Sequence, residues 1–450
     1  MTRPLTHVLV INWNGLAHLE DSFRSLTACP GDHLRFVLVD NASADGSVDF
    51  VRDRFGADQR VEFLTLERNR GWSGGNNAGI RRALDTGADY VFLLNNDTRV
   101  RPDVFDRCLD LAESDPKIGV VAPKMVLFDQ PFVLNSVGVV CSRAGACWDL
   151  GAGRADGPRW NGTAPVLAAC GGACLIRAET LRRAGLLPEE FDIYLDDVDL
   201  CVRAWDAGYS VVPCPEAVVE HKFSASMGAG DRARRKYFLA TRNRFRLLLR
   251  NLSPGQFLRV LPWVILGEAR AVGRACLDGE GWRVAAHLRA WAGALAYLPA
   301  ARRHRAERTR AGAPPRTLAR RFFAERLFCA AVTLPEDGWY PPQTADGIEV
   351  RPLAARARLH VAPGWLRVIS VNCYPSCGPS RVRISAGGGG PVVLEAPLRA
   401  ETRIFSTEGR LEFEAERLFM AEETGEAADF GGWIAVVPEE TEQPREKDTP

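Results

Sequence analysis

Apolar runs alternate with segments of helical length through the first part of the chain. Five runs have the length and composition of buried strands, and the sequence places them at 7–12, 36–40, 61–66, 90–95 and 118–122. The residues between successive runs are numerous enough for helices and connecting turns. Strand–helix alternation of this kind predicts an α/β domain with a parallel sheet.

Polar residues appear where these apolar runs end. After Tyr90–Leu94 the change takes one residue, because Asn95, Asn96 and Asp97 follow directly. Ligands of open α/β sheets bind at the carboxyl ends of the strands, so a carboxylate and two amides there suggest a hard cation and an anionic partner. An Asx turn before a helix is the alternative. The other strand ends carry similar residues: Asn12, Asn14, Asp40, Asn41, Arg68 and Asn69.

Glycines are concentrated after the third strand, in the segment RNRGWSGGNNAGI at 68–80. Because glycine lets a backbone approach a ligand closely, this segment is predicted to be a nucleotide-binding loop. A dinucleotide-binding domain would carry G-x-G-x-x-G in its first strand–helix turn, where this chain has NWNGLAH. That difference, and the absence of a P-loop sequence, disfavour nicotinamide enzymes and P-loop nucleotidases.

A second glycine-containing segment, LAACGGACLIR at 167–177, is apolar but interrupted by Gly171 and Gly172. Two interpretations stay open for it. A close backbone approach could admit an acceptor substrate. The segment could equally be a bulged core strand.

Acidic residues cluster further along the chain. Four aspartates lie among apolar residues in 191–203: Asp192, Asp196, Asp197 and Asp199. A helix starting at Asp196 would put Asp196 and Asp199 on one face with Arg203 and turn Asp197 elsewhere. Such carboxylates should raise one another's pKa values. An acidic first turn also suits the helix dipole, which is a second interpretation for one or two of them.

Basic and amphipathic segments follow. Residues 231–250 hold eight Lys or Arg against one acid, which suits phosphate or an anionic membrane. Charged residues interrupt 257–298, so it is no transmembrane span. Apolar residues at helical spacing and then five arginines predict an interfacial helix within 257–310, with a helical bundle packed on the preceding domain as the alternative. These residues are Leu288, Trp291, Leu295, Leu298, Arg302, Arg303, Arg305, Arg308 and Arg310.

Short alternating segments dominate from about residue 330 and predict a β-sandwich. They lie at 350–353, 358–361, 366–371, 381–385, 392–394, 411–413 and 433–437. The polar tail 439–450 is expected to be disordered. We therefore predict four parts: an α/β domain at 1–250, amphipathic helices at 251–328, a β-sandwich-like domain at 329–438, and the tail.

Composition and cysteine spacing limit the partners, the location and the cysteine chemistry that we expect. The 450 residues carry a net charge of +1, so overall charge gives no reason to expect nucleic acid as a partner. The first apolar run is too short for a signal peptide, so a cytoplasmic chain with mostly reduced cysteines is expected. Cys170/Cys174 and Cys373/Cys377 have three residues between partners, a spacing that disfavours zinc and favours buried thiols.

Five motifs, in order, resemble family 2 inverting glycosyltransferases of the GT-A fold, in the bacterial rhamnosyltransferase-like branch. They are VDNASADGS (39–47), RNRGWSGGNNAGIR (68–81), LLNNDT (93–98), YLDDVDLCVRAWDAGY (194–209) and VVEHKFSAS (218–226). The resemblance covers residues 5–250 and implies a Rossmann-like mixed sheet. GWYPP at 338–342 loosely resembles accessory β-sandwiches of bacterial sugar transferases.

The resemblance also implies roles for individual residues. Asp197 would be the general base with Asp196 beside it, and Asp97 and His221 would hold Mn²⁺ or Mg²⁺. The donor-binding residues would be Asp40, Asn69, Gly75, Asn76 and Asn95. The chain departs from the family pattern at Asn95, where many relatives have aspartate, and at Asp196, where the usual residue is glutamate.

The expected function is transfer of a sugar, with inversion, from a nucleotide donor to a lipid-linked or cell-surface glycan. The branch favours dTDP-rhamnose as donor, and the amphipathic segment favours peripheral association with the inner face of the cell membrane. Two alternatives stay open: a non-catalytic glycan-binding protein, and a nucleotide-cofactor oxidoreductase.

Overall fold

The chain folds into two compact units, which we describe separately. One contains residues 1–154 and 158–328, and the other contains 155–157 and 329–450. A computed structural model describes residues 3–312 except 129, 155, 158–159 and 223–230, and from residue 313 onward only the backbone of strands β12 to β20. The tail 439–450, GWYPP and the pair Cys373/Cys377 lie outside the described residues.

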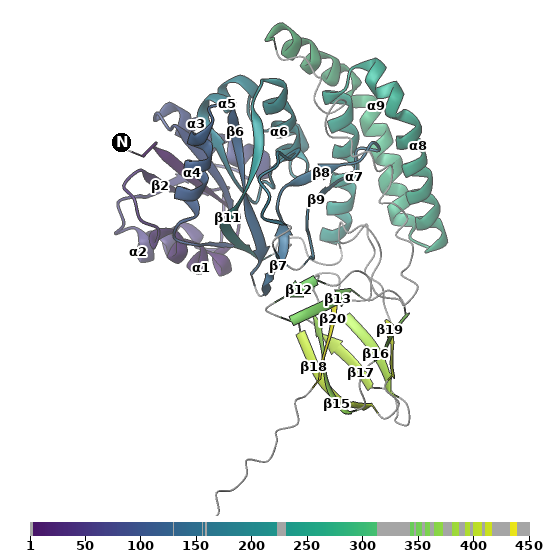
Figure 1. The fold of residues 1–450 in the computed structure, drawn as a ribbon. Coiled ribbons are helices and arrows are strands. Elements are labelled where there is room, and N and C mark those ends of the chain that lie inside the picture. Colours follow the sequence, from purple (N-terminus) through teal and green to yellow (C-terminus); the bar gives the residue numbers. More distant parts are fainter. Residues whose placement is uncertain are drawn as a thin grey trace, which may run out of the picture. The chain divides into compact units, whose positions relative to one another are not determined.

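A nine-stranded mixed sheet forms the centre of the first unit (Figure 1), in the order β3-β2-β1-β4-β10-β6-β11-β5 with β7 beside β6. The five predicted strands are confirmed, and the fifth continues five residues further than expected. They are β1 (Thr6–Asn12), β2 (Leu34–Asp40), β3 (Val61–Thr65), β4 (Tyr90–Asn95) and β6 (Ile118–Leu127). Neighbours among β1 to β4 pair in parallel, as the strand–helix alternation predicted.

Antiparallel strands complete this sheet. β10 (Ala173–Arg177) lies between β4 and β6 and runs against both. β11 (Ser210–His221) is parallel to β6, and the short β5 (Thr98–Val100) pairs antiparallel with β11. β7 (Gln130–Ser136) runs back along β6. The sheet is therefore mixed, as the GT-A resemblance implied.

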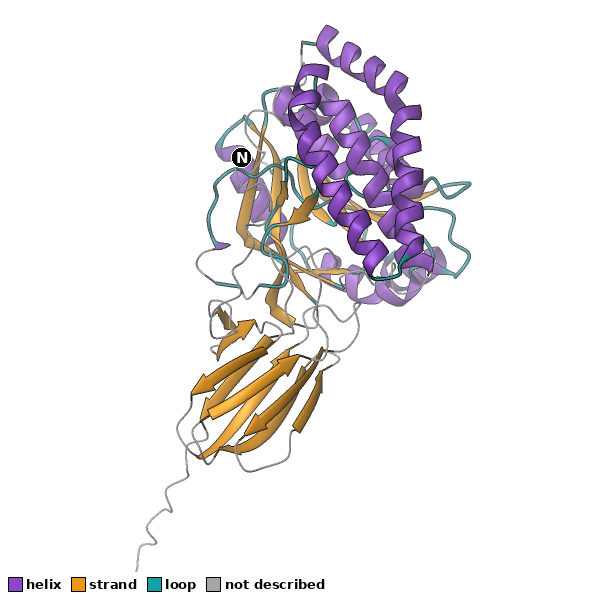
Figure 2. Ribbon diagram, turned by 90° about the vertical axis from the view of Figure 1, so that its right-hand side faces the viewer, coloured by secondary structure: helices purple, strands orange, loops and turns teal. Residues whose placement is uncertain are grey.

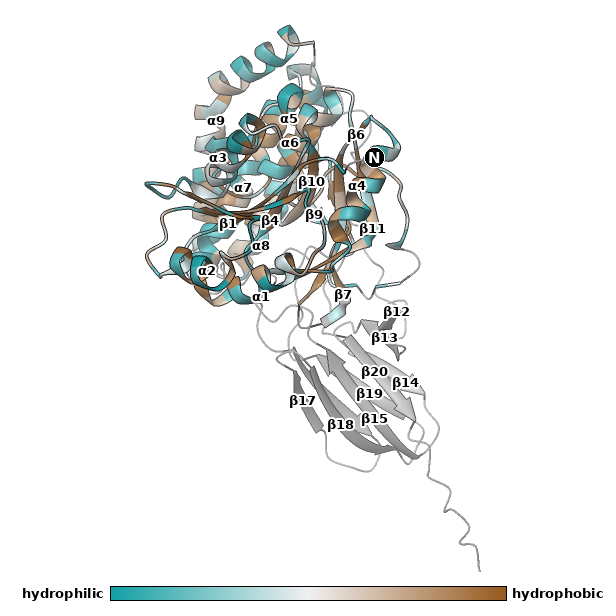
Figure 3. Ribbon diagram, turned by 90° about the vertical axis from the view of Figure 1, so that its left-hand side faces the viewer, coloured by the Kyte–Doolittle hydropathy of each residue, from teal (hydrophilic) through white to brown (hydrophobic). Residues whose placement is uncertain are grey.

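Helices cover both faces of the sheet because successive strand residues point to opposite sides. In β1, Val8 and Val10 pack with α1 (Leu16–Thr27), α2 (Ser47–Phe55) and α4 (Val104–Ser114). Leu9 and Ile11 pack in the other core, with α3 (Gly71–Asp85), α5 (Ala178–Ala184), α6 (Asp196–Asp206) and part of α7 (Asp231–Asn251). Figure 3 shows the apolar strands between these more polar helices. The result is a three-layer α/β domain.

Three long helices end the described part of the first unit and pack side by side (Figure 2). α7 is followed by α8 (Pro254–Leu277), which begins at a Ser253–Gln256 capping box, and by α9 (Gly281–Arg310). Two α7 arginines are committed to internal acids, since Arg244 pairs with Glu268 and Arg250 with Glu190. The basic segment 231–250 is therefore only partly a free cationic surface.

The predicted apolar face of α9 is largely open to solvent in this unit. Leu288 and Leu295 are 54% and 70% exposed, and Trp291 is 36% exposed. The opposite side of the helix packs, since Ala290 and Tyr297 are buried. The bundle interpretation therefore holds for one side of α9, and the interfacial interpretation of the exposed side stays a prediction. Among the described residues, no helix combines the length and hydrophobicity that a membrane span requires.

The second unit consists of two antiparallel sheets, β12-β13-β20-β15-β18 and β14-β19-β16-β17, whose strands contact each other across the layers. All seven predicted strands are present, and β12 and β18 were not predicted. The strands are β12 (Gln343–Ala345), β13 (Ile348–Pro352), β14 (Arg356–His360), β15 (Gly364–Val371), β16 (Ser380–Ala386), β17 (Val392–Ala396), β18 (Arg399–Ser406), β19 (Arg410–Ala415) and β20 (Trp433–Pro438).

Candidate active site

The polar ends of the parallel strands meet at one edge of the sheet, as predicted. Asn12 at the end of β1 donates from Nδ2 to Asp40 Oδ1 at the end of β2, at 3.2 Å. Asn96, just beyond β4, donates to Asn12 Oδ1 at 2.6 Å. Asp40 is buried, and its Oδ2 accepts from the Ser43 backbone N–H at 2.9 Å. This edge is a continuous polar floor built from three strand ends.

The glycine-rich segment is not a loop, which corrects the sequence prediction. Residues from Gly71 onward form α3, and two of its glycines let the helix lie close to the sheet. A Cβ on Gly75 would fall 2.4 Å from Ile11 Cδ1, and one on Gly79 would fall 2.9 Å from Leu9 Cδ1. The glycines therefore serve helix–sheet packing, and the α3 N-terminus lies among the strand ends.

Asn69 and Asn76 flank the start of α3. Asn69 Oδ1 accepts from Asn41 Nδ2 at 3.0 Å and from the Gly71 backbone N–H at 2.8 Å, so it fixes the entry into the helix. Asn76 is fully buried and donates from Nδ2 to the Trp72 carbonyl at 3.0 Å. Its Oδ1 has no hydrogen-bond partner among the described residues, which leaves one buried acceptor unmatched.

Asp97 and His221 meet at one corner of this edge, where β4 and β11 end. His221 Nε2 lies 3.2 Å from Asp97 Oδ1, and His221 Nδ1 lies 2.6 Å from Asn135 Oδ1. A proton on Nδ1 is donated to Asn135, so Nε2 presents a lone pair toward the carboxylate unless a proton or cation lies between them. Asn135, which sequence reasoning missed, thus orients the imidazole.

Electrostatics keep Asp97 ionised. Burial opposes its charge, but the charge and hydrogen bond that His221 supplies when protonated, with smaller contributions from His18 and the backbone, hold the pKa of Asp97 below its ordinary value. Asn95 lies beside the pair, with Nδ2 3.5 Å from His221 Nε2. Its Oδ1 accepts from Trp72 Nε1 at 3.1 Å.

The donor set at this corner fits a cation that is shared with a substrate. Among the described residues, no three His, Cys, Asp or Glu side chains gather as a ready-made metal cage. Asp97 and His221 offer one carboxylate oxygen and one imidazole nitrogen. Mg²⁺ in particular is commonly held by one or two carboxylates, with substrate phosphates and water completing its coordination.

Asp197 lies at a second corner, in the first turn of α6. Its Oδ2 accepts from the Gly171 backbone N–H at 2.7 Å, and its Oδ1 accepts from the Val198 N–H at 2.7 Å. Burial raises its pKa, although these N–H groups favour the ionised form. The Gly171–Gly172 turn precedes β10 rather than bulging within it, so the bulged-strand interpretation is wrong. A Cβ on Gly171 would fall 2.7 Å from Trp72 Cη2 and 3.1 Å from Asp197 Oδ2.

Asp196 holds a proton beside this carboxylate. Burial raises its pKa to about 8, and the charge of Asp197 adds to the effect. Ser73 Oγ lies within hydrogen-bond distance of both Asp196 Oδ2 and the Asp192 carbonyl. A hydroxyl has one proton, so both bonds form together only if protonated Asp196 donates to Ser73 and Ser73 donates to Asp192.

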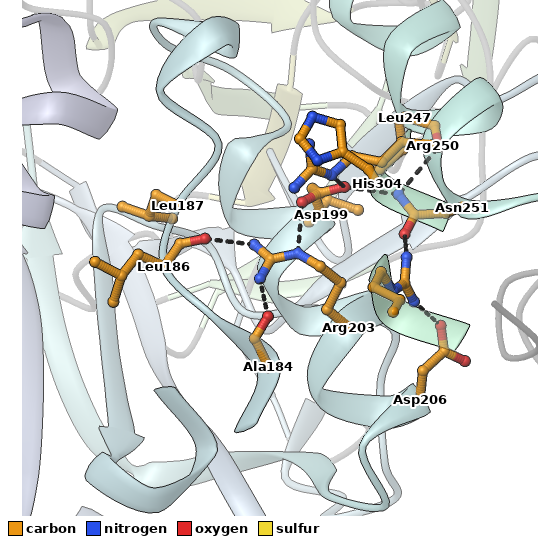
Figure 4. Close-up of polar contacts among 12 residues, drawn as sticks. Ala184, Leu186, Leu187, Asp199, Arg203, Asp206, Leu247, Arg250, Asn251 and His304 are labelled. Atoms are coloured by element: carbon orange, nitrogen blue, oxygen red, sulfur yellow. Dashed lines mark hydrogen bonds and ion pairs between the residues drawn. The ribbon is translucent and has the colours of Figure 1, made fainter. Parts of the chain in front are cut away.

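Asp199 behaves in the opposite way and corrects the expectation that all the clustered carboxylates raise one another's pKa. Burial is outweighed by Arg250 and Arg203, which lower the pKa of Asp199 to about 2. Its partners are Arg203 Nε at 2.8 Å, Arg250 Nε at 3.2 Å and Asn251 Nδ2 at 2.7 Å. Figure 4 shows this network joining α6 to α7. Asp199 therefore anchors the helix that carries Asp196 and Asp197.

Asp149 is a further carboxylate at the site that sequence reasoning missed. It ends β9 (Cys147–Asp149), which pairs with β8 (Val139–Cys141). Burial, with a contribution from Asp197, raises the pKa of Asp149 to about 6. Its Oδ1 is buried with no hydrogen-bond partner among the described residues. No signal pointed to it, because its segment has no clear hydrophobic period.

Comparisons with curated proteins identify several relatives. The chain is 30% identical over 211 residues to an uncharacterized protein of Sinorhizobium fredii, which covers 44% of this chain and 22% of that protein. It is 26% identical over 247 residues to the N-acetylglucosaminyl-diphospho-decaprenol L-rhamnosyltransferase of Mycobacterium tuberculosis, covering 49% and 77%. The chain spans 42% of a Bacillus subtilis relative that is 27% identical over 108 residues. It thus spans less than half of two of these three relatives.

A solved structure and two family models were also found. The structure is a mannosyltransferase from Pyrobaculum calidifontis in complex with GDP-mannose and Mn²⁺, at 19% identity and a TM-score of 0.42, covering 67% of this chain and 87% of that one. The model of glycosyl transferase family 2 matches residues 7–149, and that of glycosyl transferase family group 2 matches 90–301. The two matches together span residues 7–301 and support a family 2 glycosyltransferase.

Proposed function

We propose that this chain transfers a sugar from a nucleoside diphosphate donor to a glycan acceptor, with inversion at the anomeric carbon. The observation that carries the proposal is the pairing of Asp97 with His221 at 3.2 Å, on the same sheet edge as Asp197. One corner suits the charge of a diphosphate with its cation, and the other suits removal of a proton. The matches to the two glycosyl transferase models support the same reaction class.

The donor is assigned to the edge formed by β1, β2 and the start of α3. Asp40 would meet the nucleobase, and Asn69, Gly75, Asn76 and Asn95 would shape the nucleotide pocket. The positive end of the dipole at a helix N-terminus attracts anions, which supports placing phosphate near the start of α3, although the Gly71 and Ser73 N–H groups already have partners there. The unmatched Oδ1 of Asn76 leaves an acceptor for a donor hydroxyl or N–H group.

Asp197 is assigned the role of general base. Ionised Asp197 would accept the proton of the acceptor hydroxyl as that oxygen attacks the anomeric carbon. Asp196, whose pKa lies at about 8, retains its own proton and so leaves Asp197 as the ionised member of the pair. Asp97 and His221 would hold Mn²⁺ or Mg²⁺, which when bound would stabilise the charge of the departing diphosphate.

We assign dTDP-rhamnose as donor and a lipid-linked glycan as acceptor. Support comes from the Mycobacterium tuberculosis relative, named as a rhamnosyltransferase that acts on N-acetylglucosaminyl-diphospho-decaprenol. The departure at Asn95 leaves the metal corner with one aspartate instead of two. The donor phosphates would therefore supply a larger share of the cation's ligands.

A thermal-shift screen of nucleotide sugars, with and without Mn²⁺, tests the proposal. We expect dTDP-rhamnose to raise the melting temperature only when Mn²⁺ is present, because a ligand that binds only the folded state stabilises it. The product formed with a lipid-linked acceptor should show the inverted anomeric configuration by NMR. Stabilisation by NADH but by no nucleotide sugar would contradict the assignment.

We also propose that α8 and α9 bring the enzyme to the inner face of the cell membrane. Each helix exposes a row of apolar side chains, with Leu258 and Ile265 on α8 and Leu288 and Leu295 on α9. Exposed arginines follow in α9 at Arg302, Arg303 and Arg310. Apolar insertion and anionic lipid would both contribute, the latter by about 1 kcal/mol per basic residue near the surface.

Vesicle sedimentation tests this association. The protein should bind anionic vesicles at low salt and be released by high salt, and the double variant Leu288→Glu with Leu295→Glu should stay in solution. Neutral phosphatidylcholine vesicles serve as the control. A protein that ignores anionic vesicles at low salt would show that these helices do not act as a membrane anchor.

A further inference from the structure

The turn that leads into α6 is held in an unusual backbone conformation. Asp192, Tyr194 and Leu195 have positive φ angles of 71°, 72° and 63°, although none of them is glycine. Asp192 combines its φ with a ψ of −65°, near the rare γ-turn geometry. Such conformations persist only where the surroundings enforce them. This turn ends immediately before Asp196 and Asp197.

Side chains of α7 hold the turn from one side: Arg242 Nη2 donates to the Phe191 carbonyl and Arg235 Nη2 to Asp192 Oδ2, each at 2.8 Å, and Asn243 makes the most extensive contact. Asn243 is fully buried, and its Nδ2 lies 2.9 Å from each of three carbonyl oxygens, those of Phe191, Ile193 and Tyr194. Arg242 Nε donates to Asn243 Oδ1 at 3.0 Å, which fixes the amide with its N–H groups toward the turn.

The start of α3 holds the turn from the other side. The Ser73 backbone N–H donates to the Asp192 carbonyl at 3.0 Å, and Ser73 Oγ joins the same carbonyl to Asp196. Gly71 leaves the necessary space, because a Cβ there would fall 2.1 Å from Asp192 Oδ1. The turn is therefore fixed between the helix assigned to the donor and a helix of the three-helix bundle.

We infer that Asn243 is a positioning residue for the carboxyl groups of Asp196 and Asp197, acting through the turn 192–195. The two N–H groups of its amide are shared among the carbonyls of Phe191, Ile193 and Tyr194, in a backbone that would otherwise relax to negative φ. Relaxation would rotate the first turn of α6 and separate Asp196 from Ser73. The role rests on the proposed function of Asp197, but the effect on Asp196 does not require it.

The carboxyl titration of Asp196 provides a test independent of catalysis. The groups that face Asp196 are Ser73 from α3, Tyr194 from the turn and Asp197 on its own helix. In protein labelled with ¹³C at aspartate side chains, the resonance lost in Asp196→Asn should titrate at about pH 8 in the wild type. In Asn243→Ala its pKa should fall by about one unit or more, because a loosened turn admits water.

Asn251→Ala is the matched control. Asn251 is another fully buried asparagine of α7, and it bonds to Asp199 of α6 rather than to the turn. It should lower the melting temperature but leave the Asp196 titration in place. An equal shift in both variants, or no shift in Asn243→Ala, would overturn the inference. Should Asn243→Ala not fold, Arg242→Ala removes the bond that orients the amide together with the Arg242 Nη2 bond to the Phe191 carbonyl, and should shift the titration in the same direction.

Turnover gives the second measurement. If the proposed transfer is correct, Asn243→Ala should lower kcat by roughly 100-fold, the cost of misplacing a reacting group. Its KM for dTDP-rhamnose should change less than kcat, because the turn contacts Gly71 and Ser73 at the start of α3 but bonds to none of the residues assigned to the nucleotide. A shifted titration without transfer by the wild type would reject the proposed function and keep Asn243 as a positioning residue. Normal kcat alongside a shifted titration would show that the turn does not position the base.

Discussion

Two corners of the same sheet edge hold close pairs of titratable side chains, and the pairs have opposite electrostatics. Asp97 faces an imidazole, and its pKa is lowered. Asp196 faces another carboxylate, and its pKa rises to about 8. The first pair is prepared to bind positive charge, and the second retains one proton and leaves one acid ionised. Divergent environments of this kind indicate divided chemical roles.

The largest effect should come from the carboxylate pair. Asp197→Asn keeps the size of the side chain but cannot accept a proton at neutral pH, so transfer should fall by roughly 100- to 10,000-fold. Nucleotide affinity, measured by calorimetry with Mn²⁺ present, should stay close to that of the wild type. Near-normal turnover would move the base to another carboxylate, with Asp196 first and Asp149 next. Loss of donor binding would instead show that Asp197 belongs to the same binding site as Asp97 and His221.

The other corner should respond through binding. Asp97→Asn removes the charge of the carboxylate that we assign to the metal, so affinity for Mn²⁺ and for dTDP should fall together, by about tenfold or more. Asn135→Ala should act in the same direction more weakly, because it only orients His221. Calorimetry of dTDP with and without Mn²⁺ measures both. A variant that keeps Mn²⁺-dependent affinity would remove Asp97 from the metal site.

The pH dependence of stability should sharpen the comparison. Asp196 has an ordinary pKa of 3.8 and a folded value of about 8, so between these values the folded protein keeps a proton that the unfolded chain loses. Stability therefore falls as pH rises through this window. Asp196→Asn has no such proton. The melting temperature of this variant should therefore rise relative to that of the wild type as pH increases from about 5 to 8. A constant difference would show that Asp196 is ionised throughout.

The smallest effect is expected from the second unit. Every residue assigned to the donor or the cation precedes residue 222, so a chain truncated after Arg326 should bind dTDP with Mn²⁺ as the full chain does. Calorimetry of the two chains checks this. A truncated chain that folds, as judged by circular dichroism, but no longer binds dTDP would show that the second unit is needed for nucleotide binding.

Much of the fold was accessible from the sequence because its signals were local. β1, β2 and β4 are largely apolar runs buried on both faces, and each ends in polar residues that converge as parallel geometry requires. The insertion of β10 was not accessible. Its apolar residues fit either strand direction, and only pairing with β4 and β6 defines its place.

The residues whose roles the sequence did not reveal all depend on contacts with residues far along the chain. The glycines of α3 looked like a loop because glycine is rare inside helices, and their reason is contact with Ile11, Leu9 and Val39. The pKa of Asp199 depends on Arg250, which is distant in sequence. Asn135, Asp149 and Asn243 likewise act through partners far along the chain, and none sits in a recognisable motif.

The reversed direction of β10 has a consequence for how relatives of this protein could diverge. β6 ends at the polar edge, and β10 begins there, with the Gly172 carbonyl bonded to the Asn95 N–H. The chain from 128 to 172 therefore leaves and returns at the same edge, although it contains β7, β8 and β9. Insertions or deletions there would not alter strand order. Evolution could exchange this segment, including Asp149, while the polar ends of β1, β2 and β4 and the position of Asp197 stay unchanged.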